Sequence, residues 1–208
     1  MSKTTCNVAV IYYSSTGNVA AMAEALGEGA ASAGAQVRVR CVAELAPPEA
    51  IAYNPKWAEF VKVNAKEPVA TLDDIAWADA IAIGSPTRFG GPASQMKAFL
   101  DTTGGLWAKG ALVDKVGTAF TSSSTAHGGL ESTILAINNH FYHWGSIVLP
   151  LGYENEHLLK VSGNPYGASF VSRSGAAPDE VALTAARMQG ARLARVTGWL
   201  CTGKEAQA

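Results

Sequence analysis

Short apolar runs alternate with helix-forming segments along almost the whole chain. The runs typical of strands lie at residues 7–13, 36–42, 79–84, 116–120 and 146–150. The segments typical of helices lie between and after them, at residues 18–33, 72–77, 93–100, 130–143 and 179–197. Strands that alternate with helices form parallel sheets joined by right-handed crossovers. The pattern therefore predicts an α/β fold with a doubly wound, five-stranded parallel sheet and helices on both of its faces.

Three segments do not fit the alternation. Residues 46–70 contain Pro, Asn and Lys without clear periodicity, which indicates an insertion that forms a surface loop or contains a short helix. Residues 101–107 are rich in Gly and Thr, so we expect an irregular loop there. Residues 151–177 contain four glycines and predict a long loop, and long loops in a compact domain are usually functional. We expect residues 1–208 to form one domain that carries these additions.

The composition excludes several classes of protein. With 48% hydrophobic and 16% charged residues, the chain is typical of a globular protein, and its net charge of −1 argues against a nucleic-acid-binding protein. No apolar run approaches the roughly 20 residues of a membrane span, and residues 1–6 lack a signal-peptide pattern. Cys6, Cys41 and Cys201 are odd in number and form no C-x-x-C motif, as in reduced cytoplasmic proteins.

A hydroxyl-rich turn joins the first strand to the first helix. The first N–H groups of a helix lack internal partners and carry partial positive charge, so this turn can bind an anion. The turn has neither a Walker motif nor a G-x-G-x-x-G fingerprint, and it has no Lys or Arg, which favours a terminal monophosphate such as that of FMN. Ordinary helix capping by the hydroxyls is the alternative. The residues concerned are Ser14, Ser15, Thr16, Gly17, Asn18 and Val19.

Two further loops of the same kind follow the third and fourth strands. Residues 14–19, 85–92 and 121–129 are the stretches richest in Ser, Thr and Gly that come directly after an apolar run. A polar loop after the first strand predicts the strand order 2-1-3-4-5, in which these loops share the carboxyl edge of the sheet and a ligand lies at the switch point between strands one and three. A helix cap needs only one hydroxyl, whereas a planar cofactor needs several converging loops. The presence of three such loops therefore favours a cofactor site over ordinary helix capping.

The chain shows no nucleophile–base–acid set and no G-x-S-x-G elbow. His140 and His143 have a spacing seen in metal sites, but no carboxylate or thiolate accompanies them, so we predict no metal. A flavoprotein needs no catalytic nucleophile, base or acid from the protein, because the flavin carries the redox chemistry. Arg88 is a candidate to stabilise the reduced ring, or it is an ordinary surface charge. Phe89 and Trp107 are candidates to stack on flat substrates, or they are packing residues.

Specific motifs place these residues in a known family. The chain resembles the NAD(P)H:quinone oxidoreductases of the tryptophan-repressor-binding-protein type, which are flavodoxin-like proteins. The resemblance extends from residue 8 to about residue 197. Its most specific part is the combination of the runs at residues 86–90 and 103–108. The matching runs are Tyr12-Tyr13-Ser14, Pro86-Thr87-Arg88-Phe89-Gly90, Gln95-Met96-Lys97-Ala98-Phe99-Leu100-Asp101, Thr103-Gly104-Gly105-Leu106-Trp107-Ala108, His127-Gly128-Gly129, Pro165-Tyr166-Gly167-Ala168 and Ala186-Arg187-Met188-Gln189-Gly190.

The resemblance implies a function and a site. It implies two-electron reduction of a quinone by NADH or NADPH through bound FMN, in ping-pong order, by a homotetramer built as a dimer of dimers. Residues 14–19 would hold the FMN phosphate, and Trp107 and Phe89 would bind substrate. His143 would contact both cofactor and quinone, and Trp107 and His143 would come partly from neighbouring subunits. The residues implied for the flavin ring and ribityl chain are Pro86, Thr87, Arg88, Phe89, Ser122, Ser123, Ser124, Thr125, Ala126, His127 and Gly128. A flavodoxin-type electron carrier is the alternative, but the near-neutral charge and the two added segments favour the enzyme.

Overall fold

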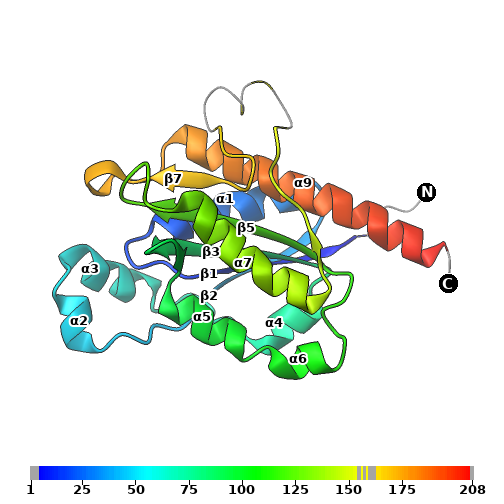
Figure 1. The fold of residues 1–208 in the computed structure, drawn as a ribbon, viewed down its shortest axis with the longest axis horizontal. Coiled ribbons are helices and arrows are strands. Elements are labelled where there is room, and N and C mark those ends of the chain that lie inside the picture. Colours follow the sequence, from blue (N-terminus) through cyan, green and yellow to red (C-terminus); the bar gives the residue numbers. More distant parts are fainter. Residues whose placement is uncertain (1–4, 154–155, 157, 159–162, 207–208) are drawn as a thin grey trace.

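The computed structural model describes residues 5–153, 156, 158 and 163–206 as a twisted parallel sheet between two layers of helices (Figure 1). The main path of the sheet runs β2-β1-β3-β5-β6, and every neighbouring pair on it is parallel. Numbered by position among the five expected strands, this is the order 2-1-3-4-5, so the predicted topology is confirmed. The strands are β1 (Asn7–Tyr12), β2 (Gln36–Cys41), β3 (Ala80–Arg88), β4 (Gly91–Pro92), β5 (Val116–Ser123), β6 (Ile147–Val148) and β7 (Ser169–Val171).

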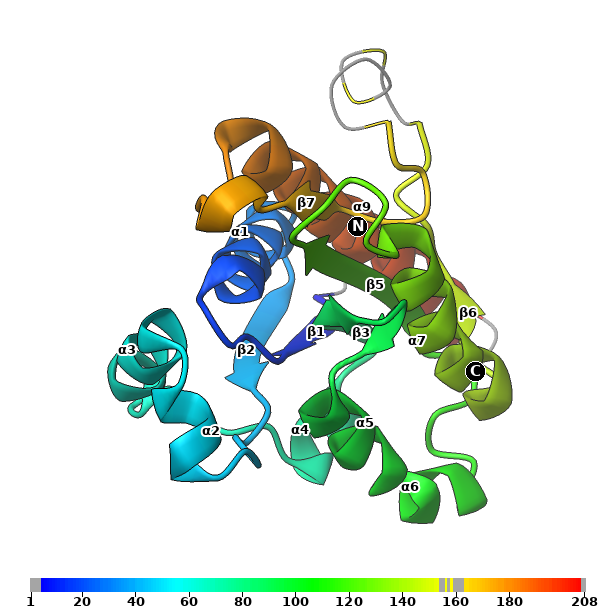
Figure 2. The same ribbon diagram turned by 60° about the vertical axis from the view of Figure 1, so that its left-hand side comes forward.

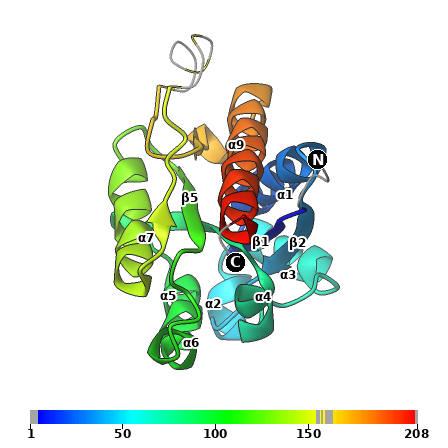
Figure 3. The same ribbon diagram turned by 90° about the vertical axis from the view of Figure 1, so that its right-hand side faces the viewer.

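The helices cover both faces of the sheet, as Figure 3 shows with α7 and α9 on either side of β5. Pairs of helices that share a face pack through apolar side chains, and the sheet separates two buried clusters. One cluster joins α1 and α9 to the sheet, and the other joins α4, α5 and α7 to it. The helices are α1 (Asn18–Ser32), α2 (Pro48–Ala52), α3 (Pro55–Asn64), α4 (Leu72–Trp77), α5 (Ser94–Asp101), α6 (Gly104–Ala108), α7 (Leu130–Trp144), the short 3-10 helix η1 (Arg173–Gly175) and α9 (Glu180–Glu205).

Burial explains the apolar pattern of the strands. β1 and β5 are buried along almost their full length because helices cover both of their faces. β2 is an edge strand with intermediate exposure, as its alternating sequence predicts. No helix among the described residues is both long enough and apolar enough to cross a membrane.

The fifth position of the sheet is divided between two strands from different parts of the chain. β6 pairs with the first residues of β5, through Val116 and Gly117, and β7 pairs with its last residues, Thr121 to Ser123. Between them, the buried side chain of Gln189 on α9 replaces the missing backbone. Its Nε2 atom donates to the Ala119 carbonyl oxygen at 2.9 Å, and its Oε1 atom accepts from the Ala168 N–H at 2.7 Å.

The sequence predictions were wrong for several segments. The expected irregular loop at 101–107 contains α6, and the insertion at 46–70 contains two helices, α2 and α3, rather than a surface loop or a single short helix. The expected loop at 151–177 contains β7 and η1, and part of it lies outside the described residues. The last helix extends eight residues beyond the expected end, to Glu205. α2 and α3 each begin at a Pro in the first turn, and Asn54 caps α3 by accepting from two N–H groups.

Candidate functional site

The three polar loops meet at the carboxyl edge of the sheet (Figure 2). The parallel register brings their starting points together, because Tyr12 pairs with Gly84 and Pro86 pairs with Ser122. The loops also bind one another through side chains. The Arg88 guanidinium donates to the Ser15 hydroxyl at 3.1 Å. These contacts confirm that loops 14–19, 85–92 and 121–129 form one surface, as the sequence predicts.

The start of α1 leaves N–H groups for an anion. Gly17 adopts φ = 93°, which favours glycine, and its N–H donates to the Ser14 hydroxyl at 3.0 Å. No side chain of the described residues caps the helix, so the capping alternative does not hold, and the first hydrogen bond into it runs from the Ala21 N–H to the Gly17 carbonyl. Ser14 and Ser15 are buried and Thr16 is exposed. This arrangement fits a phosphate group well.

The loop after β3 forms a tight hairpin with β4. Thr87 pairs with Pro92, and the N–H of Gly90 donates to the Thr87 hydroxyl at 3.2 Å. Phe89 at the tip has φ = 53°, a strained value for a bulky residue, and its ring is fully exposed. A strained, solvent-facing aromatic ring at the mouth of the three loops is placed to contact a flat ligand.

The loop after β5 is held against this hairpin. The Thr87 hydroxyl donates to the Gly128 carbonyl at 3.1 Å and accepts from the Thr133 hydroxyl at 2.8 Å. Thr133, on α7, is a site-supporting residue that the sequence analysis missed, since a buried Thr in a helix has no distinctive pattern. Ser122 and Ser123 are buried, and four residues of the loop face solvent. The exposed ones are Ser124, Thr125, Ala126 and His127.

The insertion packs against the start of α1. A Cβ atom added to Gly17 would lie 3.4 Å from the Phe60 ring of α3. A cavity of about 530 Å³ opens beside this contact, and α1, α3 and the segment around η1 supply its walls. Sequence analysis placed no ligand contact in the insertion, because its residues follow no periodic pattern. The lining residues are Thr16, Asn18, Pro55, Lys56, Glu59, Phe60, Val63, Gly175 and Ala177.

Glu44 anchors the insertion to the site. Its carboxylate accepts hydrogen bonds from the Tyr13 hydroxyl at 2.8 Å, the Trp57 indole at 2.9 Å and the Gln95 amide at 2.6 Å. Burial alone would raise the pKa of Glu44, but these bonds and the Ala46 N–H outweigh it, so the pKa is lowered. Burial, and then the bond to Glu44, raises the pKa of Tyr13. The network holds β1, α3 and α5 in fixed relation beside the phosphate-binding turn.

The structure places Trp107 and His143 together, but far from the three loops. The Trp107 indole donates to the His143 carbonyl at 3.0 Å, and both side chains are exposed. The 15 residues of α7 separate His143 from Gly129 by about 20 Å. The Gly145 carbonyl, just after α7, accepts from the Asp114 N–H, close to where β5 begins. Within one chain, this pair therefore lies at the opposite edge of the sheet from the loops.

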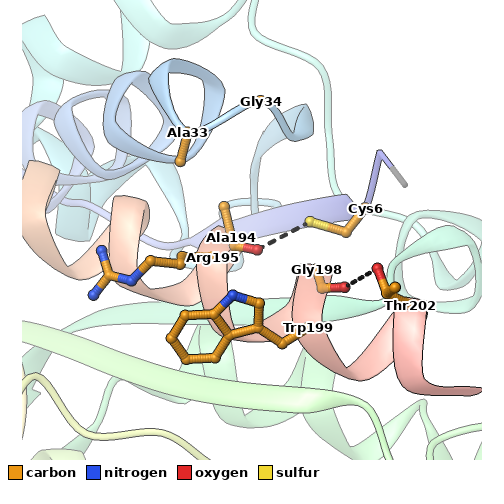
Figure 4. A pocket seen from close by; sticks show the side chains of 8 residues that line it. All are labelled: Cys6, Ala33, Gly34, Ala194, Arg195, Gly198, Trp199 and Thr202. Atoms are coloured by element: carbon orange, nitrogen blue, oxygen red, sulfur yellow. Dashed lines mark hydrogen bonds between the residues drawn. The ribbon is translucent and has the colours of Figure 1, made fainter. Parts of the chain in front are cut away.

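A second hollow lies at that amino edge, between the end of α1 and α9 (Figure 4). It measures about 420 Å³, and its lining is mostly apolar. The Cys6 thiol donates to the Ala194 carbonyl there, and burial raises the pKa of Cys6 to about 11. None of its lining residues belongs to the loops 14–19, 85–92 or 121–129. The described residues contain no cluster of His, Cys, Asp and Glu able to hold a metal ion.

Comparisons with known proteins agree with this geometry. The sequence profile of the NADPH-dependent FMN reductases matches residues 6–155. A protein of Rhodopseudomonas palustris (strain TIE-1) named NAD(P)H dehydrogenase (quinone) is 46% identical over 193 residues, which cover 90% of this chain and 94% of that protein. A protein of the same name from Paracoccus denitrificans is 44% identical over 97% of this chain and 99% of that protein.

Solved structures show the same fold. A flavodoxin-type, WrbA-like protein from Agrobacterium tumefaciens has a TM-score of 0.65 at 25% identity, over 93% of this chain and 98% of that one. An archaeal flavodoxin has a TM-score of 0.61 at 23% identity, over 92% of this chain and 98% of that one. This second likeness is one of fold alone.

Proposed function

The chain belongs to the family of NADPH-dependent FMN reductases, and from this premise we propose that it reduces quinones to hydroquinones with electrons from NADH or NADPH, with FMN as its cofactor. The observation that carries the proposal is the convergence of three polar loops on the uncapped start of α1. The relatives named NAD(P)H dehydrogenase (quinone) supply the substrate class. The protein needs to supply no catalytic carboxylate or thiolate, because bound FMN would supply the two-electron redox chemistry between the donor and the quinone.

The residues of the chain bind and orient the reactants. The N–H groups of Asn18 and Val19, together with the Ser14 and Ser15 hydroxyls, bind the phosphate. The backbone of residues 86–89 contacts the ring system. Residues 122–128 contact the ribityl chain and the ring edge. Arg88 provides positive charge that stabilises the ring when it is rich in electrons.

Phe89 and Trp107 orient flat substrates by stacking, and His143 donates a proton to a quinone oxygen. One stacking pocket serves the nicotinamide and the quinone in turn, so the donor product leaves before the quinone enters, and the kinetics are ping-pong. Because Trp107 and His143 lie about 20 Å from the loops of their own chain, we propose that a neighbouring copy supplies them in a homotetramer built as a dimer of dimers. We place this enzyme in the cytoplasm, where its three free cysteines stay reduced.

Anaerobic stopped-flow absorbance tests the proposal. Protein loaded with FMN should lose its flavin band on mixing with NADH or NADPH and recover it rapidly on mixing with benzoquinone. Recovery that starts only after the nicotinamide product has been released would support the ping-pong order. Flavin that binds but is not bleached by either nucleotide would instead indicate a carrier reduced by another protein, and failure to bind FMN would exclude the site.

A further inference from the structure

The phosphate-binding turn contains no cation of its own. Residues 14–19 include neither Lys nor Arg, although a phosphate monoester carries up to two negative charges. Arg88 reaches the Ser15 hydroxyl from the β3 hairpin, but its proposed role is beside the ring. A phosphate bound at this turn would therefore need a positive charge from the side opposite Arg88.

α3 presents a lysine toward this turn. Lys56 lines the 530 Å³ cavity together with Thr16 and Asn18 of the turn. It lies one helical turn before Phe60, whose ring packs on Gly17, so both side chains lie on the face of α3 that meets α1. Lys62, on the same helix, does not line the cavity.

The Lys56 side chain is held across the cavity by one hydrogen bond and has further donors to spare. The Lys56 ammonium donates to the Gly175 carbonyl at 3.1 Å and remains exposed to solvent. An ammonium group has three donors on a flexible stem, so it can keep this bond and donate to a phosphate as well. The Glu44–Trp57 and Tyr12–Asn64 hydrogen bonds, at 2.9 and 3.3 Å, hold α3 at both of its ends.

We propose that Lys56 is a phosphate-binding residue, and that the insertion serves to bring this charge to the 5′-phosphate of FMN. The inference rests on the proposed function, since it names a further contact of the same cofactor. Glu59 lines the same cavity and carries the opposite charge, so the two side chains should affect phosphate binding in opposite directions.

Flavin titrations test the proposal without measuring turnover. Flavin-free protein is titrated with FMN and with riboflavin, which lacks the phosphate, and binding is read from flavin fluorescence. Lys56→Met should raise the Kd for FMN roughly tenfold, as loss of a charge-assisted hydrogen bond does, and should leave the Kd for riboflavin unchanged. The FMN effect should shrink as salt rises. Glu59→Gln should tighten FMN binding, and Lys62→Met is the matched control that should change neither Kd.

Results that contradict the role of Lys56 can be told apart from those that contradict the proposed function. An unchanged Kd for FMN in Lys56→Met would show that the lysine does not contact the phosphate. An equal loss for FMN and riboflavin would indicate damage to the fold of α3 rather than a lost charge. Wild-type protein that binds neither flavin would instead overturn the proposed function itself.

Discussion

At the scale of single residues, Arg88 links two of the three loops. Its guanidinium spans from the β3 hairpin to Ser15, so Arg88→Ala removes both a loop contact and the positive charge that we propose stabilises the flavin ring. We expect FMN binding or flavin reduction to weaken roughly tenfold, with an unchanged circular dichroism spectrum. Lys109→Ala, which removes an exposed charge elsewhere, is the control. Unchanged flavin content together with an unchanged steady-state rate would contradict the role given to Arg88.

Glu44 should make stability depend on pH. Its pKa is lowered in the folded protein from a usual value of 4.5, so its contribution is present above that pH and is lost as pH falls through the folded-state pKa. We expect Glu44→Gln to lower the free energy of unfolding by about 1 kcal/mol at pH 7, because the carboxylate is only partly buried. The difference from wild type should shrink towards pH 3. Urea unfolding at several pH values measures it, and a constant difference would contradict the assignment.

At the scale of secondary-structure elements, two glycines allow α1 and α9 to touch. A Cβ atom added to Gly190 would lie 1.9 Å from the Leu26 carbonyl oxygen, and one added to Gly29 would lie 1.9 Å from the Arg187 carbonyl oxygen. Gly190→Ala should therefore cost about 1 to 3 kcal/mol of stability. Gly198→Ala, on the same helix but with open space around it, should stabilise by about 0.5 to 1 kcal/mol. Thermal unfolding of both variants tests this, and equal effects would refute the close packing.

Gln189 should be essential to the divided fifth strand. Gln189→Leu leaves the Ala168 N–H and the Ala119 carbonyl buried without their partner, which costs about 2 kcal/mol or more. Because β7 also holds Ser123 through the Ser172 N–H, amide hydrogen exchange in β7 and residues 121–129 should accelerate before that of β1. Thr202→Val, at an exposed position of α9, should stay within about 0.5 kcal/mol of wild type. Uniform acceleration throughout the sheet would contradict a local role for Gln189.

The sequence predicts well the long strands and helices of the fold and their order. Long apolar strands and helices with clear ends, such as β1 and α7, depend on local patterns that a sequence displays. The polar loops at the carboxyl edge follow from parallel topology alone. The division of the fifth strand does not, because the gap between β6 and β7 is bridged by Gln189, which lies far along the chain. Similarly, α6 and the packing of Phe60 on Gly17 depend on tertiary contacts that Gly-rich and aperiodic sequence conceals.

At the scale of the whole molecule, Trp107 and His143 lie far from the loops of their own chain, so the site that we propose takes these two residues from a neighbouring chain. Co-expressed Arg88→Ala and Trp107→Ala chains should then regain activity, because random assembly leaves about a quarter of the sites with both residues intact. The measurement is the rate of quinone reduction by the mixed oligomer against that of each variant alone. Activity equal to the mean of the two variants would show that one chain supplies the complete site.

The divided strand also sets when the site can exist during protein synthesis. β1, β3 and β5 leave the ribosome early, yet β7 and Gln189, which hold the 121–129 loop, come from the last 40 residues of the 208. The nascent chain can build most of its sheet before these residues appear, since folding follows the order of synthesis. The 121–129 loop therefore gains its support from β7 and Gln189 only after residue 189 has left the ribosome, which makes cofactor binding a late step in the maturation that we expect.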